Sequence, residues 1–514
     1  MLADILAQLQ KQASAGESGV AAAFELNWQS LEPEAQKLAC LLSLFALAPI
    51  PWSLVESAAS ASDLEFDLKA NCAVLVKRYL LQELAEDTYQ IHERIRELLQ
   101  QKLEDLAEVD ELKRGYCQAM VAIAKDIPET PILIEIAQAT FAIPHLARSA
   151  TVYQAWLSDN DLISSFVGLG RFYEGRGAYA QALLWREQSL SVARKRFGDE
   201  HPDVAQSLNN LAGLYKSQGR YSDAEPLYIQ ALAMRKRLLG EENPEVVTSL
   251  NNLAGLYYWQ GRYSDAEPLY IQALAMRKRL LGDEHPEVAT SLNNLAGLYY
   301  SQGRYSEAKP LYIEALSMRK RLLGDEHLDV AESLNNLAFL YKLQGKYSDA
   351  EPLLIQALSM MKRLRGDEHP NVASNLNNLA FLYKSQGKYS DAKSLYIEAL
   401  AMRKRLLGEE NPDVAQSLNN LAGLYESQGR YSDAEPLYIQ ALAMRKRLLG
   451  DEHPDVAISL NNLAGLYESQ GRYSDAEPLY IDALEIAAKC LGANHPNTIT
   501  YHENLEDLRR NHQP

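Results

Sequence analysis

Two adjacent asparagines recur at a fixed spacing through most of this sequence, and they are the strongest candidates for a binding function. A carboxamide offers both a hydrogen-bond donor and an acceptor, so it can pair with a peptide backbone of any sequence. Asparagine is also a poor residue for a helix interior, so two in every copy need a reason. The second members are Asn210, Asn252, Asn294, Asn336, Asn378, Asn420 and Asn462. Two interpretations stay open, which are contact with a bound peptide and bridging of neighbouring helices.

Residues that differ between the copies follow these asparagines at helical spacing and are candidates for selectivity. The aromatic ones are Tyr258, Trp259, Tyr300, Phe339 and Phe381, the lysines are Lys342 and Lys384, and the acids are Glu426 and Glu468. Aromatic and cationic groups at the centre of a groove are typical anchors of affinity. We therefore expect an extended peptide with an apolar anchor and some acidic residues. The alternative is sequence drift among recently duplicated copies.

Histidines and basic runs also recur once per copy, and both have a structural explanation. Histidines such as His285 lie about 10 Å apart if helices pack normally, which is too far for one metal ion. Asn243 and Asn411 replace two of them, which favours helix capping. The runs beginning at Arg235, Arg277, Arg403 and Arg445 end helices and precede acidic loops. We therefore expect a solvated, ion-paired face rather than a nucleic-acid site.

Composition excludes several further functions. The net charge of −17 argues against nucleic acid and fits a neutral or basic partner. No nucleophile–base pair, carboxylate dyad or metal cluster occurs outside the copies, so we expect no enzyme activity, metal or cofactor. The longest apolar stretch, Leu38 to Trp52, is too short and too broken by prolines to span a membrane. The oligomeric state stays open.

The spacing of the cysteines indicates the redox state of the compartment in which the protein functions. Cys40, Cys72, Cys117 and Cys490 are far apart in sequence, so they predict reduced thiols rather than a zinc pair or a disulfide framework. We expect a cytoplasmic protein whose partner is a protein or peptide, without membrane contact.

The unit that carries these residues is 42 residues long. The segment H-P-D-V-A-Q-S-L-N-N-L-A-G-L-Y begins at His201 and returns in seven complete copies, after a worn copy from about Asp159 and before a half copy from His495. Pro202 suits the first position of a helix, and Gly219 ends that helix. Ser222 is placed to cap a second helix. Each copy is therefore a helical hairpin.

The order Leu208-x-x-Leu211, then Tyr215, then Ala224-x-x-x-Tyr228, resembles the tetratricopeptide pattern. The 42-residue period, the L-N-N-L-A segment and the L-G-D-E-H-P loop are similar to the kinesin light chain type of repeat. This resemblance implies that the second asparagine faces a peptide-binding groove. It predicts a mainly α fold, a right-handed superhelical α-solenoid whose concave face is formed by the first helices.

The first 110 residues do not repeat and have the pattern of a small helical domain with a β-hairpin. We expect helices over Ser30–Ala46, Ser53–Ala59, Asp63–Tyr79 and His92–Leu106, and hairpin strands over Leu80–Glu83 and Thr88–Ile91. The strings F-E-L-N-W-Q-S-L near Trp28 and Y-Q-I-H-E-R-I-R-E near His92 resemble the winged-helix part of NB-ARC/STAND signalling NTPases. In that family the histidine matching His92 senses bound ADP. No G-x-x-x-x-G-K-[ST] occurs, so the NTPase core is absent.

We therefore expect four regions. They are a winged-helix-like domain over 1–110, a helical spacer over 111–158, the repeat array over 159–494 and a capping helix over 495–514. The leading hypothesis is a non-catalytic scaffold that binds an extended peptide segment. The alternative is a regulatory arm of a STAND-type NTPase supplied in trans or lost. DNA binding is a weaker hypothesis, because residues 1–160 hold 12 lysines and arginines against 23 acids.

Overall fold

The structure is a computed structural model that describes residues 17–129, 131 and 133–512. Contacts within the chain divide it into two compact units, Met1–Tyr173 and Glu174–Pro514. Residues Met1 to Leu9, whose apolar composition predicts a helical start, lie outside the described residues.

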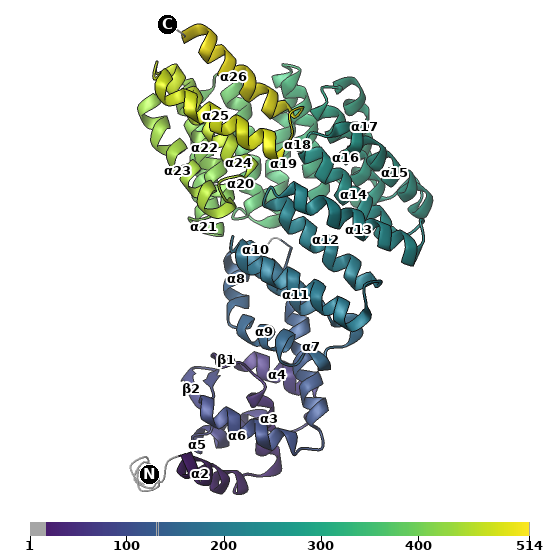
Figure 1. Cartoon of the computed structure of the whole chain (residues 1–514), viewed down its shortest axis with the longest axis vertical. Coiled ribbons are helices and arrows are strands. Elements are labelled where there is room, and N and C mark those ends of the chain that lie inside the picture. The colour runs from purple at the N-terminus through teal and green to yellow at the C-terminus, as the bar shows by residue number, and fades with distance from the viewer. Residues whose placement is uncertain (1–16, 130, 132, 513–514) are drawn as a thin grey trace. The chain divides into compact units, whose positions relative to one another are not determined.

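The first unit is mostly helical and contains one small sheet (Figure 1). Its helices are α2 (Glu17–Gln29), α3 (Pro33–Ser43), α4 (Trp52–Ala61), α5 (Leu68–Lys77), α6 (Glu93–Glu104), α7 (Val109–Asp126), α8 (Leu133–Thr140), α9 (Ile143–Thr151) and α10 (Ser164–Gly175), which crosses into the second unit. Two short 3₁₀ turns occupy Gln154–Trp156 and Asp159–Asp161. The strands are β1 (Ile50–Pro51), β2 (Gln82–Ala85) and β3 (Thr88–Gln90).

The sheet confirms the expected hairpin and adds a strand to it. Strands β2 and β3 pair antiparallel around a turn at Asp87, whose φ is 54°. The segment Ile50–Pro51 falls between two expected helices, and it forms β1 and pairs with β3. The expected helix over Asp63–Tyr79 begins later, because Asp63 adopts a φ of 52° and the Asp67 carboxylate caps α5 by accepting from the Ala70 amide.

The second unit is a series of antiparallel helical hairpins. After α11 (Tyr179–Phe197), the first helices of the copies are α12 (Pro202–Ser217), α14 (Pro244–Trp259), α16 (Pro286–Ser301), α18 (Leu328–Leu343), α20 (Pro370–Ser385), α22 (Pro412–Ser427) and α24 (Pro454–Ser469). The second helices are α13 (Tyr221–Leu239), α15 (Tyr263–Leu281), α17 (Tyr305–Leu323), α19 (Tyr347–Arg365), α21 (Tyr389–Leu407), α23 (Tyr431–Leu449) and α25 (Tyr473–Cys490), and α26 (Pro496–His512) follows.

Helix ends follow the local chemistry, with one exception. Gly219 adopts a φ of 68° directly after α12, a conformation that a side chain would strain. His201 precedes α12, and its Nδ1 accepts from the Asp203 amide at 3.2 Å. Asn243 caps α14 in the same way through Oδ1. The expected Ser222 cap is wrong, because α13 already begins at Tyr221 and has no side-chain cap.

The cap at His327 gives a direct test of this interchange between histidine and asparagine. Its Nδ1 accepts from the Asp329 amide at 3.2 Å. We expect His327→Ala to lower the free energy of unfolding by about 1 kcal/mol, because an N–H of the first turn loses its acceptor. His327→Asn should recover most of this loss, as Asn243 and Asn411 show in their copies. Urea denaturation measures both, and equal losses in the two variants would contradict a capping role.

Most interfaces between copies have the same core, and Leu354 replaces its tyrosine at one of them. Ala254, Ala266 and Tyr270 of one hairpin pack against Leu295 and Leu298 of the next first helix. The alanines are fully buried, so the helices approach closely and the tyrosine ring fills the space between hairpins. At the end of the array, α26 repeats this packing with Leu505 and Leu508 while its acidic and basic side chains stay exposed.

The first helices form the inner side of this stack. Successive first helices such as α16 and α18, or α20 and α22, approach each other closely. Within the described chain no pair of successive second helices packs as closely. A stack of hairpins bends toward the side on which its helices are closer, so the first helices line the concave side.

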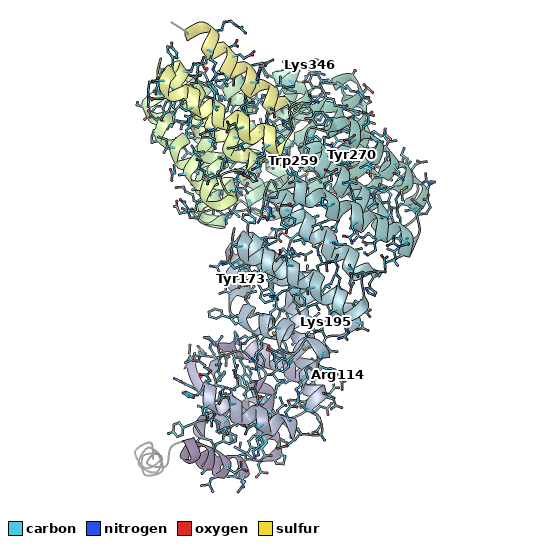
Figure 2. The ribbon with its side chains drawn as sticks, viewed as in Figure 1. Arg114, Tyr173, Lys195, Trp259, Tyr270 and Lys346 are labelled. Atoms are coloured by element: carbon cyan, nitrogen blue, oxygen red, sulfur yellow. The ribbon has the colours of Figure 1, made fainter. Side chains whose placement is uncertain are left out.

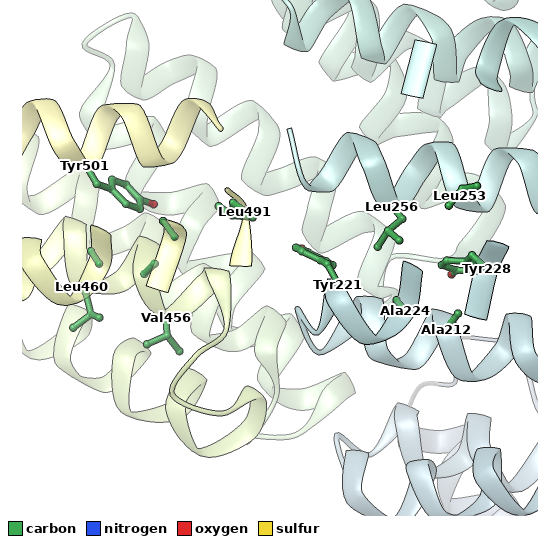
Figure 3. Packing of buried hydrophobic residues seen from close by; sticks show 13 residues of the cluster. Ala212, Tyr221, Ala224, Tyr228, Leu253, Leu256, Val456, Leu460, Leu491 and Tyr501 are labelled. Carbon is green, nitrogen blue, oxygen red and sulfur yellow. The ribbon is translucent and has the colours of Figure 1, made fainter. Parts of the chain in front are cut away.

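The bend brings the two ends of the array together. One buried cluster contains Tyr221 and Leu256 from the start of the array and Val456, Leu491 and Tyr501 from its end (Figure 3). The His453 ring also donates from Nε2 to the Ser217 carbonyl at 3.2 Å, because its Nδ1 already accepts from the Asp455 amide. The second unit therefore has a contact between successive turns as well as contacts between neighbouring copies.

Candidate functional site

The second asparagines lie at the junctions between first helices. Asn252 Nδ2 donates to Asn209 Oδ1 of the preceding copy at 2.8 Å, and Asn336 donates to Asn293 at 2.9 Å. Asn378 and Asn462 make the corresponding bond. Bridging between helices is thus present, and it uses the amide nitrogen.

The carbonyl ends of these bridging asparagines remain available. Among described residues, none donates a hydrogen bond to Oδ1 of Asn252, Asn336, Asn378 or Asn462. All seven second asparagines are half-buried. Asn210 and Asn420 differ, since their oxygens accept from Gln206 and Gln416 of the same helix. Bridging therefore fixes the carboxamide without consuming its acceptor.

The variable residues form a second row on the first helices, which we call the inner row. It consists of Lys216, Tyr258, Tyr300, Lys342, Lys384, Glu426 and Glu468, one from each copy. Two of its members contact residues of the following copy. The Tyr258 hydroxyl lies 2.8 Å from Ser301 Oγ, and Lys342 Nζ lies 3.3 Å from the centre of the Phe381 ring. After Lys216 in the first copy, the row therefore runs from aromatic, through basic, to acidic.

Burial lowers the pKa of both lysines in the middle of this row. Burial, together with the charge of Lys384, lowers the pKa of Lys342 to about 8. Burial also lowers the pKa of Lys384, and Glu426 partly offsets that effect. Glu426 accepts from the Tyr438 hydroxyl at 2.7 Å, and Glu468 accepts from Tyr480 at 2.8 Å. The two lysines thus carry a positive charge that is incompletely solvated.

Trp259 takes a different place from the other aromatic candidates. Its side chain is 55% exposed and lies where the two ends of the second unit meet (Figure 2). Phe381 is also exposed, whereas Tyr258, Tyr300 and Phe339 are half-buried. The structure therefore brings the asparagines and the inner row together on the first helices, and it places Trp259 at the end of α14 with its ring centre 5.8 Å from that of Tyr258.

The basic runs are only partly the solvated face that the sequence predicts. Their last arginines are exposed and pair with the preceding acidic loop, as Arg279 does with Glu242 at 2.7 Å. The prediction is wrong for the first arginines Arg235, Arg403 and Arg445, and the equivalent Arg319 of another copy has the same environment. Arg235, Arg319, Arg403 and Arg445 are buried, and each donates from a terminal nitrogen to a buried serine of the next copy at 2.8 Å. A run of three charged residues predicts exposure for all three, so the sequence does not indicate that its first arginine is buried.

The remaining titratable candidates are histidines that cap helices and cysteines that are buried. The histidines that begin the copies cap first helices, which confirms the capping interpretation. His92 caps α6, and its Nδ1 accepts from the Arg94 amide. Burial raises the pKa of the Cys40 thiol to about 12 and that of Cys117 to about 11.

Two further observations on the described residues concern metal binding and membrane crossing. Across the residues that the structure describes, no cluster of three or more His, Cys, Asp or Glu is arranged to hold a metal ion. In the same residues no helix combines the length and the apolar character that crossing a membrane requires.

A curved stack of two-helix units with its variable residues on the inner helices is an α-solenoid of the helical-repeat class. The tetratricopeptide repeat family model matches residues 161–237, 245–321, 290–363, 329–405, 371–447, 413–489 and 455–512. A second model of this repeat matches residues 209–275. The chain belongs to the tetratricopeptide repeat family, whose members are typically non-catalytic scaffolds for protein–protein interaction. No curated protein matches it in sequence.

Solved structures of repeat proteins resemble parts of the chain. A putative kinesin light chain from Podosopora anserina, with nearly identical repeats, is 28% identical over 40% of this chain and 97% of its own, with a TM-score of 0.34. A STAND protein with a tetratricopeptide repeat sensor from Pyrococcus horikoshii is 16% identical over 83% of this chain and 65% of its own, with a TM-score of 0.38. A Rap protein complexed with a competence and sporulation factor is 15% identical over 69% and 92%, with a TM-score of 0.46.

Proposed function

We propose that the inner side of the repeat array binds an extended segment of another protein, and that the second asparagines hold its backbone. The observation that carries this proposal is the set of half-buried asparagines whose amide nitrogens bridge the helices while their Oδ1 atoms accept from no described residue. A fixed acceptor can take a backbone N–H at little entropic cost. Family membership supports the proposal, since these repeats serve protein–protein interaction.

The inner row supplies the selectivity. Tyr258 and Tyr300 offer aromatic surface, Lys342 and Lys384 offer positive charge, and Glu426 follows them. Partly desolvated lysines gain most from an anionic partner, because an opposite charge restores what burial removed. The segment should therefore present an apolar side chain to the early copies and acidic side chains to the middle ones.

Repeat spacing sets the length of the partner segment. The stretch from Tyr258 to Glu426 crosses four steps of about 10 Å each, the usual distance between packed helices. An extended chain covers about 3.3 Å per residue, so a segment of about 12 residues spans this stretch. A displayed library of random 16-residue peptides is therefore a suitable probe.

We expect peptides selected from that library on the full chain to bind the variant Asn294→Ala, Asn336→Ala, Asn378→Ala at least tenfold more weakly. Loss of three backbone hydrogen bonds of about 0.5–1.5 kcal/mol each accounts for such a change. Fluorescence anisotropy of labelled peptides measures the affinity. Circular dichroism establishes that the variant folds, since two of the asparagines also bridge helices.

A matched control removes three apolar side chains from the second helices of the same copies. Ile313, Ile355 and Ile397 are between 43% and 47% exposed. Their replacement by alanine should leave peptide affinity unchanged. Selected peptides that bind the asparagine variant as tightly as the unaltered chain would contradict the proposal, and loss of binding in the isoleucine variant would move the site to the second helices.

A second candidate function, a regulatory arm for a separate STAND-type NTPase, is favoured by the first unit. Its three helices α3, α4 and α5, followed by the β2–β3 hairpin and α6, occur in the order expected of a winged-helix domain. Co-purification of the full chain with an NTPase in the presence of ATP or ADP tests this candidate. Association that depends on the nucleotide supports it, and absence of any NTPase under both conditions contradicts it.

A further inference from the structure

The contact between turns of the array forms a partly open cavity of about 420 Å³. Its walls come from copies far apart in sequence, with Lys216 and Trp259 at the ends of α12 and α14, and Ile458, Leu491 and His495 near α24 and α26. Such a volume accommodates a small organic molecule. All of these residues belong to the second unit.

Two departures from the repeated sequence fall in this cavity. Trp259 occupies a position where five of the other six copies have serine and one has Leu343. Ile458 occupies a position where every other copy has a polar residue, such as Gln206 or Thr290. Trp259 remains 55% exposed, so its ring offers surface to the cavity instead of filling it. The departures thus give apolar walls to a cavity that lies where successive turns meet.

Lys216 brings an uncompensated positive charge to the same cavity. Burial alone lowers its pKa, and no acidic group offsets that effect. Asp455 also lines the cavity. Burial lowers the pKa of Arg445 and of His453, and the charge of Asp455 opposes both shifts, whereas it does not contribute to the pKa of Lys216. The described residues include no hydrogen-bonding or ion-pair partner for the ammonium of Lys216.

A second donor lies on the opposite wall. His495 Nδ1 accepts from the Asn497 amide at 3.0 Å, so the proton of the neutral ring is on Nε2. The ring packs close to Gly261, where a Cβ atom would lie 2.5 Å from His495 Cδ2. His453, in contrast, already donates its proton to Ser217.

We propose that this cavity binds a small organic anion with a flat apolar body. Its anionic group pairs with the Lys216 ammonium, and its body lies against Trp259 and Ile458. A carboxylate suits this arrangement because it accepts charge-assisted hydrogen bonds from a lysine and an imidazole N–H together. The site is independent of the asparagines and of Lys342 and Lys384, so it can be tested separately from peptide binding.

Titration with 2-naphthoate, followed by calorimetry on the full chain, tests the proposal. We expect binding that weakens at least tenfold in Lys216→Met and in Trp259→Ser, and that is retained in Lys216→Arg. Serine is the residue of most copies at this position, so Trp259→Ser should fold normally. Neutral 2-naphthylmethanol should bind the unaltered chain at least tenfold more weakly than naphthoate, and equally to the chain and to Lys216→Met.

The controls distinguish this cavity from other sites. Lys346→Met, at an exposed lysine outside the cavity, should leave naphthoate affinity unchanged. Absence of naphthoate binding at millimolar concentration would overturn the proposal. Unchanged affinity in Lys216→Met and Trp259→Ser, with native circular dichroism, would overturn the location, and equal affinity for acid and alcohol would overturn the anionic character.

Discussion

Replacement of Arg319 by alanine is expected to lower the free energy of unfolding by about 3 kcal/mol. Arg319 is 2% exposed, and its Nη1 donates to Ser333 Oγ at 2.8 Å and to the Asp329 carbonyl at 2.9 Å. Alanine leaves the buried Ser333 hydroxyl and this carbonyl without their donor and also opens a cavity. Both losses occur at the interface between two copies, so they weaken the stack directly.

One interface of the chain lacks this arginine and satisfies the same hydrogen-bonding groups in another way. At the equivalent interface one copy later, Met361 replaces the arginine and Asn375 replaces the serine. Asn375 Nδ2 donates to the Asn371 carbonyl at 2.8 Å, the counterpart of the Asp329 carbonyl. Its Oδ1 accepts from Asn335 at 2.7 Å. The amide therefore replaces the arginine's hydrogen bond, and the methionine replaces its volume.

The combination of methionine and asparagine can be transferred to the Arg319 interface and tested with a matched set of variants. We expect Arg319→Met with Ser333→Asn to recover most of the stability lost in Arg319→Ala, whereas Arg319→Met alone should recover less. Arg321→Ala, two residues on, removes an exposed arginine that pairs with Glu284 and should cost below about 1 kcal/mol. Denaturation in urea measures all four. Equal stability of the Arg319 and Arg321 alanine variants would contradict a structural role for the buried arginine.

Local chemistry made much of the array predictable from the sequence. Pro202 and His201 define the beginning of a helix, and Gly219 defines its end, because each acts through its own backbone or through a residue two positions away. The period of 42 residues then transfers these boundaries to every copy. The β2–β3 hairpin was predictable for the same reason, whereas β1 was not, because two residues acquire strand structure only by pairing with Tyr89 and Thr88.

Contacts between copies were less predictable. Arg235 and Arg237 stand in one charged run, yet Arg235 is buried and Arg237 is exposed, because only the former faces a serine of the next copy. A pattern within one unit does not reveal such a pairing. One signal in the sequence could have revealed the pairing. In one copy Met361 replaces the arginine, and Asn375 replaces the serine of the next copy, so the two positions change together.

The contact between turns could not be predicted at all from the repeat unit. It depends on the small rotation between neighbouring copies, which accumulates until α24 reaches α12. A slightly different rotation would separate these helices, although every local contact would be nearly the same. Trp259 illustrates the consequence, because its place in the sequence predicts the inner side of the array, whereas the cavity that it lines includes Ile458 and His495 from the other end.

Acidification is expected to destabilise the first unit through His145. This histidine is fully buried, accepts from the Ala46 amide at Nδ1 and lies 3.0 Å from the Pro49 carbonyl at Nε2. Burial lowers the pKa of His145 to about 4, the Pro49 hydrogen bond opposes this shift, and the charge of Arg148 adds to it. In the unfolded chain the pKa is about 6.5.

The sign and size of the effect follow from this difference. Because the folded pKa lies below the unfolded one, the stabilisation from neutral His145 is complete above pH 6.5 and is lost as the pH falls toward 4. A difference of about 2.5 units corresponds to about 3 kcal/mol. His145→Gln removes the titration, since an amide offers an acceptor and a donor without charging. The stability difference between the two chains should therefore shrink by about 3 kcal/mol from pH 7 to pH 4.

Tryptophan fluorescence can report this change from the first unit alone. With Trp185→Phe and Trp259→Phe in both chains, the remaining tryptophans are Trp28, Trp52 and Trp156, which all lie in the first unit. Urea denaturation at several pH values then compares the chain with its His145→Gln variant, and carboxylates that titrate in both cancel from the difference. Parallel pH profiles would show that His145 can charge in the folded state, which requires the Ala46 amide to lose its acceptor. Converging profiles would establish that the ring stays neutral in the folded state while the unfolded chain takes up the proton.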